Sequence, residues 1–264
     1  MEWWIVYLLM GVFVGFFAGL LGIGGGLLLV TAMVFLFSLQ GFPADRIVHL
    51  ALGTALTSIV FTSISSLRAH YRHGAVRWDI VKMATPGLVV GTLLGTFVAD
   101  RLASKYLAIF FVAFVYYAAA QMLVDLKPKP TRTVPGWTGM SVAAFITGIV
   151  SSLVGAGGGL LSIPLMTMCN VPMRNAVGTS AALGLPIAIA GAAGYIYTGL
   201  GQDHLPPLTL GYIYIPALVG IVIGTFVTVP AGAKVAHTMP VRRLKQIFAV
   251  LLFLMATKML WTLF

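Results

Sequence analysis

Charged side chains are scarce in this 264-residue chain: Asp, Glu, Lys and Arg make up 8% of the positions, whereas hydrophobic residues make up 59%. Soluble globular domains carry about 25% charged residues, so this composition excludes a water-facing shell. Eight apolar segments are long enough to cross a bilayer, at about residues 3–21, 48–67, 80–99, 106–124, 138–154, 176–198, 208–229 and 246–263. The sequence therefore predicts an all-α polytopic protein whose surface is covered by the lipid bilayer.

Acidic residues are the rarest charged type, and none is predicted deep in the membrane. All six fall at segment ends or in loops: Glu2, Asp45, Asp79, Asp100, Asp125 and Asp203. Without an intramembrane carboxylate to bind Na⁺ or a cationic solute, an anionic cargo is favoured. The net charge of +10 does not indicate nucleic-acid binding, because the Lys and Arg residues lie in short loops, where they set membrane orientation.

Cysteine occurs once, at Cys169, which excludes an internal disulfide and a multi-cysteine metal site. An intramembrane hydrolase would need a nucleophile and a base that meet inside the membrane. The five histidines do not meet this need, since all are predicted at segment ends or in loops: His49, His70, His73, His204 and His237. We therefore expect no enzymatic activity, no catalytic residue, no metal site and no cofactor.

Three short motifs occur twice along the chain, in the same order. They are the glycine motif, "GLLGIGGGLLLV" (19–30) and "SLVGAGGGLLSI" (152–163), the GT block, "LALGTAL" (50–56) and "NAVGTSA" (175–181), and the GTF motif, "GTLLGTF" (91–97) and "GIVIGTF" (220–226). Duplication explains such long-period similarity. The sequence therefore predicts two membrane repeats, residues 1–124 and 138–264, joined by a linker at residues 125–137.

The loop charges orient the two repeats. Residues 68–77, after the first GT block, contain three arginines, and the corresponding loop at 199–207 contains no Lys or Arg; one span later the bias reverses. Because Lys and Arg accumulate in cytoplasmic loops, equivalent loops are predicted on opposite sides of the membrane. We expect an inverted-topology repeat of about five helical segments per half, with a cytoplasmic linker and both termini outside.

Each glycine motif is predicted to break a helix inside the membrane. The number of crossings requires residues 138–175 to enter the membrane and return to the same side, and the return limb Leu160–Cys169 is only about half a bilayer long. Leu27–Ser38 is similarly short. Lipid cannot satisfy the freed backbone groups, so each break must be buried or line a cavity. The free N–H groups and positive dipole end of the following helix would form an anion site near the midplane.

Glycines that recur every four residues have a different role. They predict close helix–helix packing, and they are Gly11, Gly15 and Gly19, the pair Gly91 and Gly95, and the pair Gly220 and Gly224.

The predicted binding site combines the glycines of both motifs with nearby hydroxyl groups that can donate to an oxyanion. Its residues are Gly22, Gly24, Gly25, Gly26, Thr54, Thr57, Ser58, Gly155, Gly157, Gly158, Gly159, Thr179 and Ser180. His49 and Arg174 lie at aligned positions before the GT blocks. They are candidate gate residues at opposite entrances; snorkelling to the membrane interface is the alternative reading.

The paired motifs "GLLGIGGGLLLV" and "SLVGAGGGLLSIPLM", each followed by a GT block, resemble the TauE/SafE sulfite exporter family, also called the toluene sulfonate uptake permease (TSUP) family. The resemblance covers essentially the whole chain. It implies a bacterial cytoplasmic-membrane carrier of sulfite, sulfonates or related organosulfur anions, without a cofactor. Thr31 stands where the second half has Pro164, so the two halves are not expected to move equally.

We therefore expect a secondary transporter of a small sulfur-containing anion that works by alternating access. A passive anion channel and an importer of another inorganic anion are the alternatives. Saturable flux that accumulates substrate against its gradient would exclude the channel.

Overall fold

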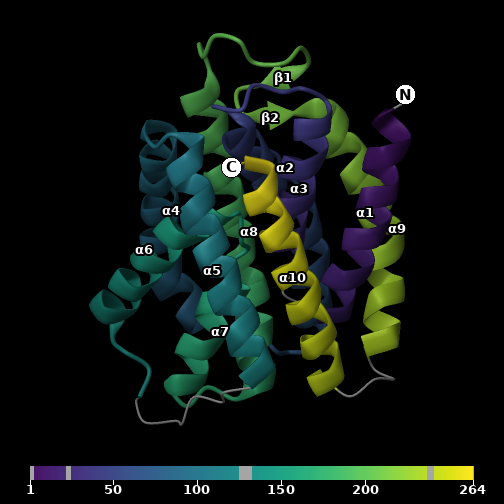
Figure 1. Ribbon diagram of the computed structural model, residues 1–264. Coiled ribbons are helices and arrows are strands. Elements are labelled where there is room, and N and C mark those ends of the chain that lie inside the picture. Colours follow the sequence, from purple (N-terminus) through teal and green to yellow (C-terminus); the bar gives the residue numbers. More distant parts are fainter. Residues whose placement is uncertain (1–2, 22–24, 125–132, 237–240, 264) are drawn as a thin grey trace.

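The computed structural model describes residues 3–21, 25–124, 133–236 and 241–263. These residues form ten helices and one two-stranded ribbon. The elements are α1 (Trp3–Leu21), α2 (Gly26–Leu39), α3 (Ile47–Arg72), α4 (Trp78–Arg101), α5 (Ser104–Val124), α6 (Trp137–Val154), α7 (Gly159–Met168), α8 (Met173–Gly199), β1 (Thr209–Leu210), β2 (Ile213–Tyr214), α9 (Ile215–Ala236) and α10 (Val241–Leu263). The helices lie side by side in one bundle, with the ribbon at one end (Figure 1).

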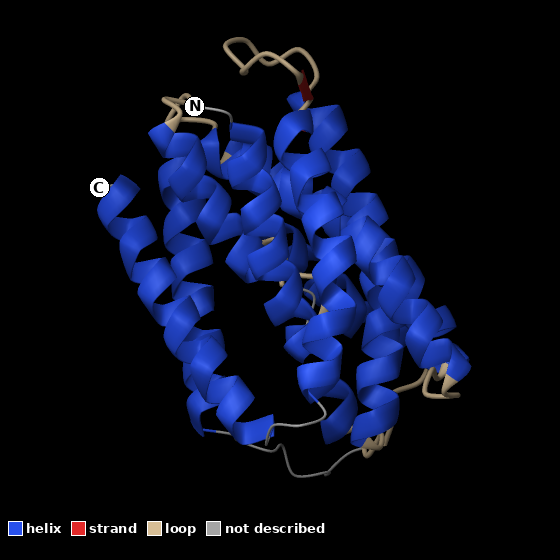
Figure 2. Ribbon diagram, turned by 90° about the vertical axis from the view of Figure 1, so that its right-hand side faces the viewer, coloured by secondary structure: helices blue, strands red, loops and turns tan. Residues whose placement is uncertain are grey.

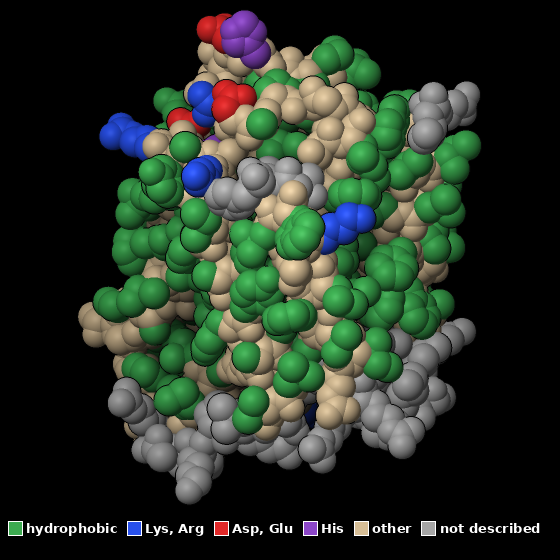
Figure 3. Space-filling model, viewed as in Figure 1, with side chains coloured by type: hydrophobic (Ala, Val, Ile, Leu, Met, Phe, Trp, Pro, Cys, Tyr) green, Lys and Arg blue, Asp and Glu red, His purple; other side chains and the backbone are tan. Residues whose placement is uncertain are grey.

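The described helices have the length and composition of a multi-pass membrane protein. Six are long and apolar enough to cross a bilayer, and α1, α2, α7 and α10 add shorter apolar stretches. Large hydrophobic side chains are exposed on the outside of the bundle, including Phe226 at 74% and Trp261 at 86% exposure. Figure 3 shows such side chains over most of one face, while the charged side chains coloured there gather mainly near the ribbon end. This confirms the predicted polytopic helical class.

The helices break at both glycine motifs, as predicted. Gly25 precedes α2 with φ +60°, and Gly158 precedes α7 with φ +79°. Residues with a side chain rarely adopt this left-handed conformation, so glycine is required where the chain turns. α2 has 14 residues and α7 has 10, which at about 1.5 Å per residue is well short of a bilayer. Figure 2 shows loop segments at mid-height inside the bundle.

The glycine stripes pack helices against each other, also as predicted. α1 runs along α9, and α4 runs along α6 (Figure 1). A β-carbon placed on Gly11 would lie 2.6 Å from the carbonyl oxygen of Ile221, and one placed on Gly91 would overlap the carbonyl oxygen of Phe145. Backbones approach this closely only where glycine leaves room, and van der Waals packing is what holds helices together in lipid.

One predicted span begins in a different conformation. The apolar segment expected from about residue 208 starts instead with the antiparallel ribbon, in which Thr209 pairs with Tyr214, and the helix begins only at Ile215. Gly211, at φ +55°, makes the turn between the two strands. Hydropathy cannot distinguish a short apolar ribbon from the first turns of a helix, so this start was wrong.

Substituting Gly91 by Ala should destabilise the protein by about 1–3 kcal/mol, because the added methyl group overpacks the contact between α4 and α6. Thermal unfolding of the detergent-purified protein would measure the loss. Gly136→Ala is the matched control, since a β-carbon there meets no atom within 4 Å. Equal melting temperatures for the two variants would contradict the packing role of Gly91.

Candidate substrate site at the glycine bends

The two glycine bends, far apart in the sequence, touch inside the bundle. A β-carbon placed on Gly26, the first residue of α2, would overlap the carbonyl oxygen of Gly155, which directly follows α6. One placed on Gly155 would lie 2.6 Å from Cγ2 of Val30 in α2. The backbones of the two motifs are therefore in direct contact. The predicted site residues Gly22 and Gly24 lie outside the described residues.

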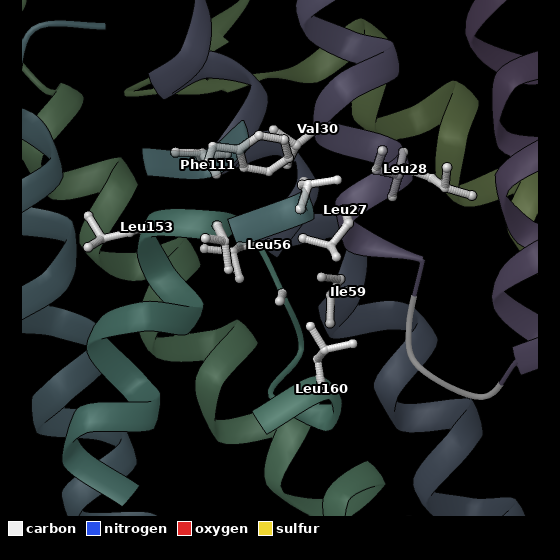
Figure 4. Packing of buried hydrophobic residues seen from close by; sticks show 14 of the residues in the cluster. Leu27, Leu28, Val30, Leu56, Ile59, Phe111, Leu153 and Leu160 are labelled. Atoms are coloured by element: carbon white, nitrogen blue, oxygen red, sulfur yellow. The ribbon is translucent and has the colours of Figure 1, made fainter. Parts of the chain in front are cut away.

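The space beside the first bend is small and apolar. A cavity of only about 10 Å³ borders Gly25, Gly26, Leu27, Leu160 and two further apolar residues. A space of about 10–15 Å³ is the least that can hold a single water molecule. Figure 4 shows Leu27 of α2, Ile59 of α3 and Leu160 of α7 near one another, where α2 and α7 begin. The described end of the first bend is therefore closed by packing.

The second bend borders a much larger cavity of about 350 Å³. Gly157 and Gly159 form part of its wall, and α3 lines it from Ile59 to His70, in the last turn of that helix. Ser180 and other residues of α8, the end of α1, and α9 complete the wall. The volume lies within the range of about 300–1,000 Å³ that is typical of small-molecule sites.

Hydroxyl groups connect this cavity to the second bend. The Ser162 hydroxyl donates to the carbonyl oxygen of Gly158 at 2.6 Å and lies 3.1 Å from the hydroxyl of Ser180. Ser180 is 3% exposed and borders the cavity. Of the predicted hydroxyl residues, Ser180 alone is brought to this cavity in the described structure.

The threonines of the two GT blocks hold the chain at the start of a later helix. Oγ1 of Thr54 accepts a hydrogen bond from the backbone N–H of Tyr214, which directly precedes α9, at 3.0 Å. Oγ1 of Thr179 accepts one from the backbone N–H of Arg77, which directly precedes α4, also at 3.0 Å. Both threonine side chains are fully buried. The geometry thus gives each hydroxyl a structural partner.

The glycines of the GT blocks make room for the same segments. A β-carbon on Gly53 would lie 2.5 Å from the carbonyl oxygen of Tyr212, and one on Gly178 would lie 2.7 Å from that of Ala75. The two GT blocks therefore make matching contacts. In each, the glycine contacts the residue two positions before the one whose N–H donates to the threonine.

The remaining predicted hydroxyls bond within their own helix. Thr57 donates to the carbonyl oxygen of Gly53 at 2.8 Å, and Ser58 donates to that of Thr54 at 2.9 Å. Neither residue borders the described cavities.

The two candidate gate residues lie at opposite ends of the bundle. His49 is fully buried near the ribbon, where its ring nitrogens lie 2.9 Å from the carbonyl oxygen of Ala99 and 3.2 Å from Oγ of Ser104. Arg174 is exposed at the other end, where it donates to the carbonyl oxygen of His73 at 2.5 Å. The complete burial of His49 excludes snorkelling for that residue.

Sequence reasoning missed a polar cluster that closes the ribbon end. Nη1 of Arg46 donates to the hydroxyl of Tyr212 at 2.8 Å, and this hydroxyl donates to Oδ1 of Asp100, also at 2.8 Å. Nη1 of Arg46 lies 3.9 Å from Oδ1 of Asp100, and the Tyr212 ring stacks on the His49 ring. The only signal was the position of Arg46 and Asp100 at segment ends, which does not say that they meet.

Two glycine-broken helices that meet inside an apolar bundle, beside a partly polar cavity, are typical of membrane transporters. Residues 7–259 match the family described as "Sulfite exporter TauE/SafE", and the chain belongs to this family. It is 34% identical to a "Probable membrane transporter protein" of Haemophilus influenzae over 254 residues, which cover 96% of both chains. It is 27% identical to proteins of the same description from Bacillus subtilis, over 89% of this chain and 90% of the relative, and from Methanocaldococcus jannaschii, over 96% and 94%. No solved structure matches the chain significantly.

Replacing Thr54 or Thr179 by Val should destabilise the protein by about 1–3 kcal/mol, because a partly buried backbone N–H loses its acceptor. Thr→Ser at the same positions keeps the oxygen and should restore most of the stability. Melting temperatures of the purified variants would measure both effects. A normal melting temperature combined with lost substrate affinity would assign these threonines to the substrate instead.

Proposed function

We propose that the protein is a secondary transporter of a small sulfur-containing oxyanion, such as sulfite or a sulfonate. The observation that carries this proposal is the 350 Å³ cavity bordered by Gly157, Gly159 and Ser180. The first N–H groups of a helix have no partner within it, and here those of α7 begin at the cavity wall. Together with the positive end of the helix dipole and the Ser180 hydroxyl, they form a site for anionic oxygens.

We further propose that residues 1–124 and 138–264 are inverted repeats. Two sets of matching contacts support this arrangement: each GT block binds the residue before α9 or α4, and α1 packs along α9 as α6 packs along α4. With the linker at 125–137 cytoplasmic and both termini outside, the ribbon end faces outward. The second half of α3, and with it the cavity, then faces the cytoplasm of a bacterial cell.

The two repeats differ in a way that supports alternating access. A β-carbon on Gly194 of α8 would overlap Oγ1 of Thr96 in α4, so these two helices are in contact. The aligned positions in the other pair of helices are Ala69 of α3 and Thr225 of α9. Ala69 borders the large cavity, and Thr225 borders an adjoining one of about 170 Å³. In the opposite state of the carrier, α9 would close on α3 and α4 would leave α8.

Proteoliposomes containing the protein should take up labelled sulfite with saturable kinetics and accumulate it when a driving gradient is imposed. Gly157→Ala should raise KM about tenfold, which corresponds to about 1.4 kcal/mol, because the added methyl group enters the cavity wall 3.3 Å from Cγ2 of Ile59. Gly136→Ala is the control with unchanged transport. Uptake that never saturates, and that never raises the internal anion concentration above the equilibrium value, would favour the passive channel. Accumulation of another inorganic anion in place of sulfite would redirect the substrate assignment.

Cysteines introduced at Gly74 and Gly201, in a Cys169→Ala background, should react with an impermeant thiol reagent from opposite sides of the membrane. Both positions are open, since a β-carbon there meets no atom within 4 Å. Labelling of right-side-out and inside-out vesicles would measure the sidedness. Reaction of both cysteines from the same side would overturn the inverted arrangement.

A further inference from the structure

The hydroxyl of Ser63 lies at the wall of the large cavity without a partner in the described protein. Ser63 lies in α3, is 7% exposed and borders the cavity. Its hydroxyl has no hydrogen-bond partner among the residues that the structure describes. The preceding residue, Thr62, donates instead to its own backbone, at the carbonyl oxygen of Ile59. Because the Ser63 hydroxyl has no protein acceptor and borders the cavity, it can donate to a ligand there.

The position of Ser63 brings its hydroxyl to the second glycine bend. A β-carbon on Gly184 of α8 would lie 3.2 Å from Oγ of Ser63 and 3.0 Å from the carbonyl oxygen of Gly157. Gly184 itself borders the cavity. Because Gly184 has no side chain, it leaves the Ser63 hydroxyl uncovered on the cavity side. α3, α8 and the segment that precedes α7 therefore converge here.

The hydroxyl groups of Ser63 and Ser180 have no counterpart at the aligned positions of the other half. By the alignment of the GT blocks, Ser63 corresponds to Ala188 in the second half, and Ser180 corresponds to Ala55 in the first half. Ala55 and Ala188 are both fully buried. In both aligned pairs the serine borders the large cavity, whereas the alanine borders none of the described cavities.

We propose that Ser63 donates a hydrogen bond to an oxygen of the bound oxyanion, together with Ser180 and the first N–H groups of α7; this assignment rests on the proposed function. The ligand class is a small anion with at least two oxygens, because the donors come from different helices around the cavity. One donor belongs to α3 in the first half and the others to α8 and α7 in the second. Substrate binding would therefore connect the two halves directly.

The test is a binding titration of the full-length, detergent-purified protein with sulfite, methanesulfonate, sulfate, phosphate and nitrate. Ser63→Ala should weaken binding of the preferred oxyanion about tenfold, a loss typical of one hydrogen bond to a charged group. Ser151→Ala is the matched control: the hydroxyl of Ser151 likewise lacks a partner, but this residue is fully buried and borders none of the described cavities. It should bind like the wild type.

A second variant tests directly whether the side chain at position 63 contacts the ligand. Ser63→Cys in a Cys169→Ala background should react with a small thiol reagent, and the preferred oxyanion should slow this reaction. Protection by the anion supports the assignment even if Ser63→Ala folds poorly. Reaction at the same rate with and without the anion overturns it.

The outcomes separate this assignment from the proposed function. A sulfur oxyanion that binds equally well to the wild type and to Ser63→Ala overturns the role of Ser63 and leaves the proposed function intact. If the wild type binds phosphate or nitrate but no sulfur anion, and Ser63→Ala weakens that binding, the role of Ser63 is supported and the sulfur substrate is overturned. An equal loss in Ser151→Ala, or no anion binding to the wild type, overturns the assignment.

Discussion

A helix that breaks inside a bilayer exposes backbone donors and acceptors that lipid cannot satisfy. This chain contains two such breaks, and their surroundings differ. The bend before α2 is enclosed by Leu27, Leu160 and their neighbours, next to a space too small for a ligand. The bend before α7 borders a large cavity with hydroxyl groups on its wall. The described end of the first bend is thus buried among apolar side chains, whereas the second bend borders a space large enough for a small anion.

Glycine serves three separate purposes in this fold, and each has its own geometry. At the bends, as at Gly158, it permits a left-handed backbone conformation. Along α1 and α4, as at Gly91, it lets two helices approach until backbone meets backbone. In the GT blocks, as at Gly53, it admits a carbonyl group from the segment before the next helix. Spacing separates the second purpose from the others, and backbone conformation separates the first from the third, since Gly158 has a φ of +79° and Gly53 lies within α3.

That distinction explains how much could be predicted from the sequence. The helical class, the breaks at both glycine motifs and the glycine stripes follow from hydropathy and spacing, which are local properties. The role of a hydroxyl is not local: Thr54 accepts from a backbone N–H 160 positions away, while Ser63, nine residues later on the same helix, faces a cavity. The serine-rich stretch at 62–66 was the available signal, because several hydroxyls in an apolar span need partners. The ribbon at 209–214 was hidden by its apolar composition.

The unequal surroundings of the bends also fit the one departure between the glycine motifs. In α2, Thr31 is buried and its hydroxyl lies 3.0 Å from the carbonyl oxygens of Leu27 and Leu28; this helix packs against both α3 and α10. In α7, the aligned position is Pro164, which has no N–H to donate to the preceding turn, and this shorter helix packs chiefly against α8. The first bend is therefore held from two sides, and the second is held mainly by the helix that supplies Ser180. A shift of α8 would carry α7 and its free N–H groups with it, so that the donors move together with the wall of the cavity they line.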